Sequence, residues 1–196
     1  PGPSAYDFRG STIRKTTLDL NAVEWAQFLA ERLRGFPKQV FCEKQFPEND
    51  MEFLRTIAAD TWRFFDEIVD RETYLLLDTI CLTPGGPFGE GGYVGDYTNV
   101  TNIGLYLICL VAGYDFGFID AAEAQKRISE TLATIESLET HGNFLFNYYD
   151  TTTKERTSNF VSLVDSGWLT LGIYIVKNAF PENEELAERC RALLGG

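Results

Sequence analysis

Two predicted helices of this chain are apolar on nearly every face. One covers about 100–116 and has no charged residue before Asp115, and the other covers about 162–180 and has Asp165 as its only charge before Lys177. A helix without a polar face cannot lie at a surface, so both must be covered by other parts of the chain. A chain of 196 residues is long enough to bury such a core in one domain.

The other predicted helices have polar faces and alternate with the two apolar ones along the chain. From residue 50 onward the order is exposed, buried, exposed, buried, exposed, which is the pattern of outer and inner helices in an α/α toroid. The predicted fold class is therefore all-α, of the α/α toroid type, with about six helices. The segments with polar faces are about 21–34, 50–69, 120–138 and 182–194.

Two long connections, about 70–97 and 141–160, lead from an outer helix into an apolar one, and each ends in a cluster of Tyr, Asn, Thr and Asp. The first contains the string TPGGPFGEGGYVG, and the second alternates in a way that predicts a short β-hairpin flap near 144–160. Both connections must emerge on the same rim of the ring. The N-termini of the inner helices point to that rim, and their free N–H groups suit polar or anionic ligands.

Composition excludes several classes of partner. The formal net charge is -12, which argues against a nucleic-acid partner because phosphate binding needs clustered Lys and Arg. Four cysteines without a CxxC pair and a single histidine do not form a zinc pattern, and we expect neither a metal nor an organic cofactor. The longest uncharged stretch, 100–114, is too short to span a bilayer, so no membrane span is expected.

Four stretches, DTWRFFDEIVD, YTNVTNIGLYL, FNYYDTTT and VSLVDSGWL, resemble the signature segments of the glucoamylase-like domain. That domain occurs in cyclic β-1,2-glucan synthases and in related glycoside hydrolases of (α/α)6-barrel architecture. The resemblance extends over about 50–180 in the same order. It implies a carbohydrate-active domain that acts on a β-glucan-like polysaccharide or oligosaccharide by acid–base glycoside hydrolysis or transglycosylation.

The resemblance also implies where a sugar cleft would lie. It aligns the family's cleft residues with Asp78 in LLLDT, with Thr98–Leu107, and with Asp150 and Asp165. This sequence departs from the family at Phe160, where relatives have a Glu five residues before the VDSG aspartate. A closed (α/α)6 barrel also needs twice as many helices as this chain supplies.

Three alternatives for the other half of the ring stay open at this point. Either the chain is a piece of a longer protein, or the remainder of the ring comes from another chain, or the helices close into a smaller bundle.

For domain organisation we expect an N-terminal arm with the first helix over 1–46 and the glucoamylase-like helical domain over 47–196. The first ten residues lack the features of a signal peptide, and the compartment, bacterial cytoplasm or cell envelope, is left open.

Asp165 and Asp150 are the predicted catalytic acids. Burying Asp165 in an apolar helix is costly without a partner, so it is either an acid tuned by burial or a first-turn residue that satisfies backbone N–H groups. Asp150 follows the string FLFNYYD and suits either a ligand-facing acid or an Asx-turn. If the two carboxylates face each other, a separation of about 6.5–9.5 Å favours inversion and about 5–5.5 Å favours retention.

The remaining polar and aromatic residues of the two clusters are predicted to contact the substrate. Thr98 and Asn99 are equally typical of helix caps, and Tyr148, Tyr149 and Trp168 are either sugar-stacking rings or core. Two rival functions are a non-catalytic glycan-binding or accessory module of a larger polysaccharide synthase and a helical protein-interaction scaffold. The predicted substrate-binding residues are Asp78, Asp96, Tyr97, Thr98, Asn99, Thr101, Asn102, Asn147, Tyr149 and Trp168.

Overall fold

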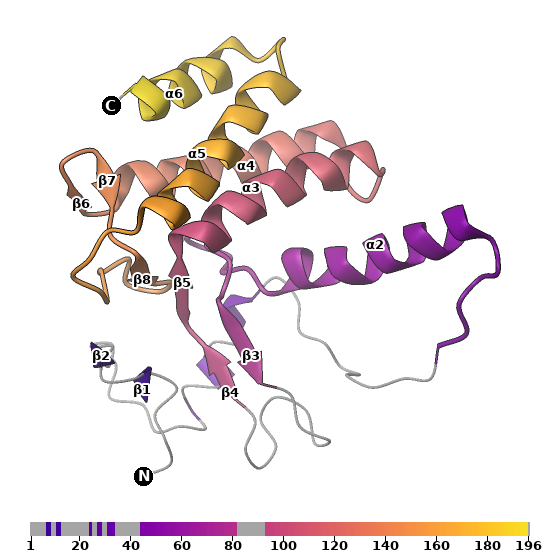
Figure 1. The fold of residues 1–196 in the computed structure, drawn as a ribbon, viewed down its shortest axis with the longest axis horizontal. Helices are drawn as coiled ribbons and strands as arrows, with labels where there is room; N and C mark the ends of the chain where they lie inside the picture. The colour runs from indigo at the N-terminus through magenta and orange to yellow at the C-terminus, as the bar shows by residue number, and fades with distance from the viewer. Residues whose placement is uncertain are drawn as a thin grey trace.

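The computed structural model describes residues 7–8, 11–12, 24, 27–28, 31–33, 44–81 and 93–195 (Figure 1). Its helices follow the predicted ones to within about two residues at each end. The predicted helix over 21–34 falls largely outside the described residues, as does the glycine-rich part of the first connection. The helices are α2 (Asp50–Glu67), α3 (Val100–Asp115), α4 (Ala121–Ser137), α5 (Leu163–Ala179) and α6 (Glu184–Gly195).

Short antiparallel strand pairs accompany the helices. The pairs are β1 (Asp7–Phe8) with β2 (Ser11–Thr12), β3 (Thr79–Cys81) with β4 (Tyr93–Gly95), β5 (Tyr97–Asn99) with β8 (Tyr148–Asp150), and β6 (Thr140–His141) with β7 (Phe144–Leu145).

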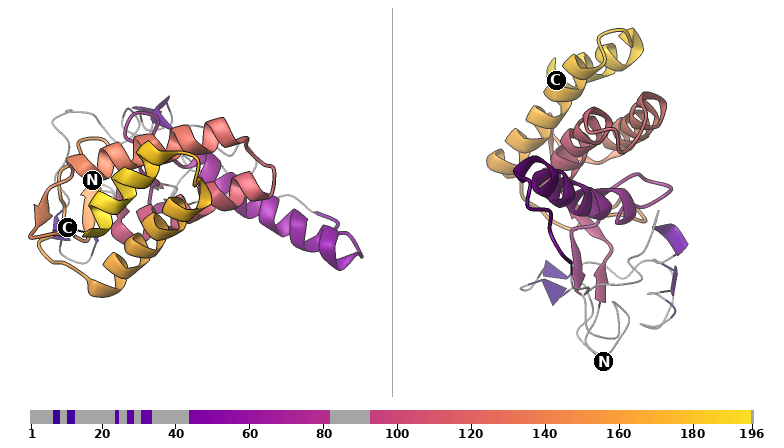
Figure 2. Two further views of the ribbon diagram at one scale, coloured as in Figure 1. Left: turned by 90° about the horizontal axis from the view of Figure 1, so that it is seen from above. Right: turned by 90° about the vertical axis from the view of Figure 1, so that its right-hand side faces the viewer.

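The helices form two successive hairpins, α3–α4 and α5–α6, with α2 extending away from them (Figures 1 and 2). Both α3 and α5 begin with a side-chain cap: the Asn99 side chain accepts a hydrogen bond from Asn102 N, and Ser162 Oγ accepts one from Asp165 N. These caps satisfy backbone N–H groups that have no partner within the helix. The two apolar helices therefore start where the two polar connections end.

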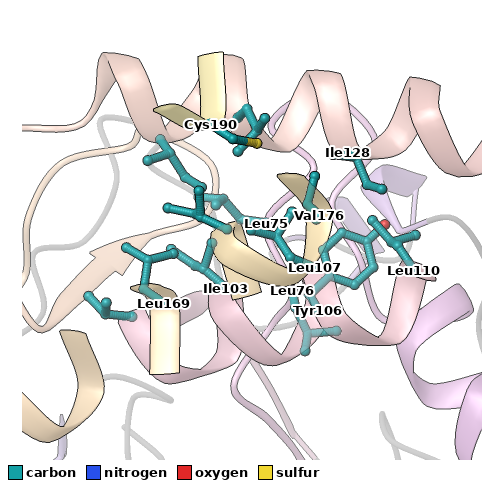
Figure 3. Packing of buried hydrophobic residues seen from close by; sticks show 14 of the residues in the cluster. Leu75, Leu76, Ile103, Tyr106, Leu107, Leu110, Ile128, Leu169, Val176 and Cys190 are labelled. Atoms are coloured by element: carbon teal, nitrogen blue, oxygen red, sulfur yellow. The ribbon is translucent and has the colours of Figure 1, made fainter. Parts of the chain in front are cut away.

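Helix α3 is the centre of the core, as its apolar sequence predicts. Its buried side chains pack against α4, α5 and the segment that follows α2 (Figure 3). Tyr106 and Leu107 are fully buried, and they meet Leu75, Ile128 and Val176 in the same cluster. Helix α4 contributes only one face to this cluster, which fits its amphipathic pattern.

Helix α5 differs from the prediction that it is buried all round, and that prediction is wrong for one of its faces. Leu169, Ile173 and Val176 pack into the core, but Leu163 is 77% exposed and Tyr174 is 55% exposed. The sequence pattern shows that α5 has no polar face. It does not show which part of the protein covers each face of the helix.

Helices α3 and α5 cross in backbone contact. A Cβ atom built on Gly104 would lie 2.4 Å from the Trp168 carbonyl oxygen, and one built on Gly172 would lie 2.5 Å from the Gly104 carbonyl oxygen. Real Cβ atoms do not approach that closely, so only glycine fits at either position. This crossing holds the N-termini of the two apolar helices on the same side of the molecule (Figure 1).

The predicted flap near 144–160 is present in a different form. Strand β8 is not the arm of a free two-stranded flap, because it pairs with β5, with Tyr97 opposite Asp150 and Asn99 opposite Tyr148. A bridge between Tyr149 and Arg156 closes the turn that follows β8. The two polar clusters of the sequence are therefore joined directly by a β-ladder.

Substitution of the crossing glycine tests this packing. Gly172→Ala should lower the free energy of unfolding by about 1–3 kcal/mol or more, because the added methyl group overpacks the contact with Gly104. Gly167→Ala in the same helix is the matched control, since a Cβ there meets no atom within 4 Å. It should raise stability by about 0.5–1 kcal/mol through the helix preference of alanine. Urea denaturation measures both, and equal effects of the two substitutions would contradict the close crossing.

Candidate functional site

The Asp78 carboxylate is the centre of a polar network at the rim. Its Oδ1 accepts hydrogen bonds from Asn102 Nδ2 at 2.7 Å and from Asn99 Nδ2 at 3.3 Å, and its Oδ2 accepts one from Thr79 Oγ1 at 2.8 Å. Asp78 N also donates to Tyr97 O, which ties the residue to β5. The first connection and the N-terminal turn of α3 thus fix one half-buried carboxylate in a single orientation.

A second half-buried carboxylate, Asp165, lies in the first turn of α5. Its Oδ1 accepts a hydrogen bond of 2.6 Å from Thr101 Oγ1, so the first turns of α3 and α5 are joined through their side chains. Its backbone N–H donates to the Ser162 cap. Asp165 therefore lies in the first turn of α5, but the backbone cap there is Ser162, and the Asp165 side chain instead has Thr101 of the neighbouring helix as its partner.

Tyr148 lies near both carboxylates. It is opposite Asn99 in the ladder between β5 and β8, and its ring makes edge contacts with the rings of Tyr97 and Phe160, at centroid distances of 6.1 and 6.3 Å. Burial raises the pKa of its hydroxyl, as do the negative charges of Asp78 and Asp165, while a hydrogen bond with Asn99 lowers it. The two carboxylates therefore act electrostatically on the same phenol group.

These groups can exchange hydrogen bonds with a polyhydroxylated ligand. Carboxylates accept hydrogen bonds, amides donate and accept, and the hydroxyls of Thr101 and Tyr148 do both. Two exposed rings border the same region: Phe160, 54% exposed, contacts Tyr148, and Trp168, 43% exposed, lies one turn beyond Asp165. Aromatic faces next to convergent polar groups are typical of ligand sites.

Asp150 and Tyr149 have different surroundings from those expected of site residues. Asp150 is 2% exposed, and its Oδ1 accepts hydrogen bonds from Thr152 N and Thr153 N, which is an Asx-turn. Tyr149 is fully buried and its hydroxyl donates to Glu139 O. Neither side chain bonds to the rim network, so this geometry supports structural roles for both residues.

Four further predicted residues lie behind the rim. Asp96, Tyr97, Thr98 and Asn147 are all nine-tenths buried or more. The Asp96 carbonyl oxygen accepts from Thr151 N and Thr151 Oγ1, and the Asn147 carbonyl oxygen accepts from Val100 N. Their backbone groups connect the two loops, which supports the rim without presenting a side chain to a ligand.

The structure also brings in residues that are absent from the predicted substrate-binding list. Tyr148, considered from the sequence only as a stacking ring or a core residue, contacts the network described above, as do Thr79 and Ser162. Alternation along a strand could have indicated Tyr148, because adjacent residues point to opposite faces and only one of Tyr148 and Tyr149 can enter the core. Thr79 had no signal beyond its position next to Asp78.

No metal cluster or membrane-spanning helix is found in the part of the chain that the structure describes. Across 44–81 and 93–195, and the shorter described pieces before them, no three His, Cys, Asp or Glu side chains gather as metal ligands would. Within the same residues, no helix combines the length and apolar character needed to cross a bilayer.

Asp150 offers a test of its role in the turn. Burial raises the pKa of the Asp150 carboxyl group, so the folded protein binds the carboxyl proton more tightly than the unfolded chain does. The stability that this group contributes is therefore lost as the pH rises through the pKa of the folded state. Asp150→Asn keeps the acceptor oxygen and removes the charge, so it should match or exceed wild-type stability at pH 7. Asp150→Ala should lose about 1–2 kcal/mol. Thermal unfolding against pH checks this, and an Asn variant as unstable as the Ala variant would contradict the turn role.

Comparison with known proteins adds a relationship in sequence and one in fold. No family model matches the chain. Over 122 residues it is 36% identical to the cyclic β-(1,2)-glucan synthase NdvB of Rhizobium meliloti, a match that covers 61% of this chain and 4% of the synthase.

Solved structures with the same fold include glucoamylase-like and glucanase proteins. A provisionally named glucoamylase from Bacteroides fragilis matches with a TM-score of 0.65 and 17% identity over 78% of this chain and 37% of that one. A β-1,2-glucanase from Parabacteroides distasonis matches with a TM-score of 0.61 and 18% identity over 78% of this chain and 21% of that one. The chain thus spans well under half of each of these proteins. It has the all-α, α/α toroid fold of these matched structures.

Proposed function

We propose that this chain binds a β-linked glucan at the rim formed by Asp78, Asn99, Asn102, Thr101 and Asp165, with Tyr148 near both carboxylates. The observation that carries this proposal is the Asp78 network, in which two amides and a hydroxyl orient one half-buried carboxylate. An oriented carboxylate with neighbouring donors can bind sugar hydroxyls at a lower entropic cost than mobile side chains.

The relatives and the charge of the chain support a neutral β-glucan as the class of sugar. The matched synthase is named for a cyclic β-(1,2)-glucan, and the matched structures include two named as β-1,2-glucanases. A neutral glucan is also compatible with a formal net charge of -12, which would repel anionic polysaccharides. Exposed Trp168 and Phe160 would stack on pyranose faces beside the polar network.

Acid–base hydrolysis is the second candidate. The observation in its favour is that Asp165 is half-buried and oriented by Thr101, and that its charge, like that of Asp78, raises the pKa of Tyr148. In such a reaction one carboxylic acid protonates the leaving oxygen and another carboxylate activates water or attacks the sugar. Phe160 occupies the position at which the family resemblance expects a Glu, so the described rim has one fewer carboxylate and binding is the better supported role.

Binding is tested by titration with β-1,2-linked gluco-oligosaccharides. Asp78→Asn and Asp165→Asn should each weaken binding about 10- to 100-fold, because a hydrogen bond to a charged group is worth about 1.5–3 kcal/mol. Glu130→Gln makes the same charge change in the middle of α4, on an exposed position, and should leave the affinity unchanged. Calorimetry gives the affinities, with α-1,4-linked oligosaccharides as the comparison ligand. An equal loss of affinity in all three variants would show that the net charge of the chain, and not the rim, determines binding.

Hydrolysis is tested separately by the release of reducing ends from β-1,2-glucan. If Asp165 is the acid, Asp165→Asn should lower the rate about 100-fold or more while the circular dichroism spectrum stays that of wild type. Undiminished turnover in this variant would remove Asp165 from the chemistry. If the wild-type chain binds the glucan but releases no reducing ends, the result supports the binding role and contradicts hydrolysis.

A further inference from the structure

Two residues of the N-terminal arm, Arg32 and Leu33, pair with the segment that leads to Asp78. The Arg32 carbonyl oxygen accepts a hydrogen bond of 2.7 Å from Arg71 N, and Leu33 lies opposite Asp70 in an antiparallel β-bridge. Arg32 and Asp70 are 38 residues apart in the sequence, so this is a long-range contact. These two arm residues therefore belong to the structure around the proposed site.

The Leu33 side chain lies in a small apolar cluster next to Asp78. It is 1% exposed and packs with Ile68 and Leu77, in a cluster separate from the main core. Leu77 N donates to Ile68 O at 3.0 Å, and Leu77 is the residue directly before Asp78. Because neighbours in a packed core shift when one side chain is truncated, Leu33 restricts the position of Leu77 and of the carboxylate that follows it.

The Arg32 side chain holds the same segment through a buried carboxylate. Its Nε donates to Asp70 Oδ2 at 2.6 Å and its Nη2 donates to Asp70 Oδ1 at 3.0 Å, and Asp70 is 1% exposed. Asp70 Oδ1 also accepts from Glu72 N and Thr73 N, which closes a tight turn. A buried carboxylate needs a paired charge, so the loss of the guanidinium group would disturb this turn.

The turn that Arg32 stabilises also contacts the second polar connection. Thr73 Oγ1 donates to Thr151 O at 2.7 Å, and Thr151 N donates to Asp96 O at 2.8 Å. Asp96 directly precedes β5, and the carbonyl oxygen of the first β5 residue accepts from Asp78 N. Two sets of contacts, one apolar and one polar, therefore connect the arm to the rim.

We propose that Arg32 and Leu33 are positioning residues of the rim: they hold the segment that carries Asp78, so that the affinity for a glucan depends on the N-terminal arm. This inference rests on the function proposed above. In this role neither side chain contacts the ligand. Both act on the Asp78 carboxylate, which must stay within 2.7 Å of Asn102 Nδ2 and 3.3 Å of Asn99 Nδ2 to keep its hydrogen bonds.

The side-chain amides of Asn99 and Asn102 test this positioning without any ligand. Both amides donate to Asp78 Oδ1, so their NMR signals report where the carboxylate lies. Arg32→Gln and Leu33→Ala should each move both amide signals, because each variant removes one set of contacts behind the carboxylate. Signals that stay in place in both variants would overturn the proposal.

The matched control is an arginine that makes the same kind of ion pair elsewhere. Arg189 of α6 donates from Nε and Nη2 to the two carboxylate oxygens of Glu136 in α4, at 3.0 Å each. Arg189→Gln removes that pair and should leave the amide signals of Asn99 and Asn102 unchanged. Equal movement in this control would show a general response to a lost ion pair, and it would overturn the proposal.

Titration with β-1,2-linked gluco-oligosaccharides measures the consequence for binding. Arg32→Gln and Leu33→Ala should each weaken binding about 5-fold or more, as is typical of coupling between separate parts of a protein. Leu33→Met keeps the volume of the side chain and should keep the wild-type affinity, as should Arg189→Gln. Wild-type affinity in both arm variants would overturn the proposal, even if the amide signals move.

Two further outcomes are distinguishable. If the wild-type chain binds no glucan, the function proposed above fails, and the amide signals still decide whether the arm holds Asp78. Thermal unfolding shows which variants are folded at the temperature of the titration. Where Arg32→Gln or Leu33→Ala does not fold, the milder Arg32→Lys or Leu33→Val takes its place, with the same expected direction of change.

Discussion

The backbone contact between α3 and α5 at Gly104 and Gly172 is the constraint on which the rest of this structure depends. It brings two helices without polar faces into backbone contact and buries the sides that face each other. It also fixes the relative positions of their first turns, so that Thr101 of one helix reaches Asp165 of the other at 2.6 Å. The core contact and the polar rim are therefore parts of one arrangement.

The ladder between β5 and β8 completes that arrangement. It joins the connection before α3 to the connection before α5, and it places Asn99 opposite Tyr148. Asp78 is held to the same ladder through the Tyr97 carbonyl group. Two segments separated by a helical hairpin in the sequence thus form one side of the proposed site, and hydrogen bonds within it orient their polar side chains.

Much of the fold could be predicted from the sequence because its signals are local. Apolar runs and capping residues such as Asn99 and Asp120 predict the helices to within about two residues. The exposed face of α5 could not be predicted, because an apolar pattern requires a cover without saying which residues provide it.

The site was harder to predict than the helices. Asp78, Asp150 and Asp165 are all aspartates at the ends of apolar or aromatic stretches, and strand pairing decides which of them turns inward. The same pairing sends Tyr149 into the core and leaves Tyr148 near the two rim carboxylates. Such long-range pairing leaves only a weak trace in the local sequence.

Residue-resolved NMR during titration with a β-1,2-linked gluco-oligosaccharide tests the central claim most directly. The side-chain amides of Asn99 and Asn102 and the indole N–H of Trp168 should shift together along one binding curve. The side-chain amide of Asn183, at the start of α6, should not move. Shifts centred on α2 or α6, or no shifts at any concentration, would contradict the assignment of the rim between α3 and α5 as a glucan site.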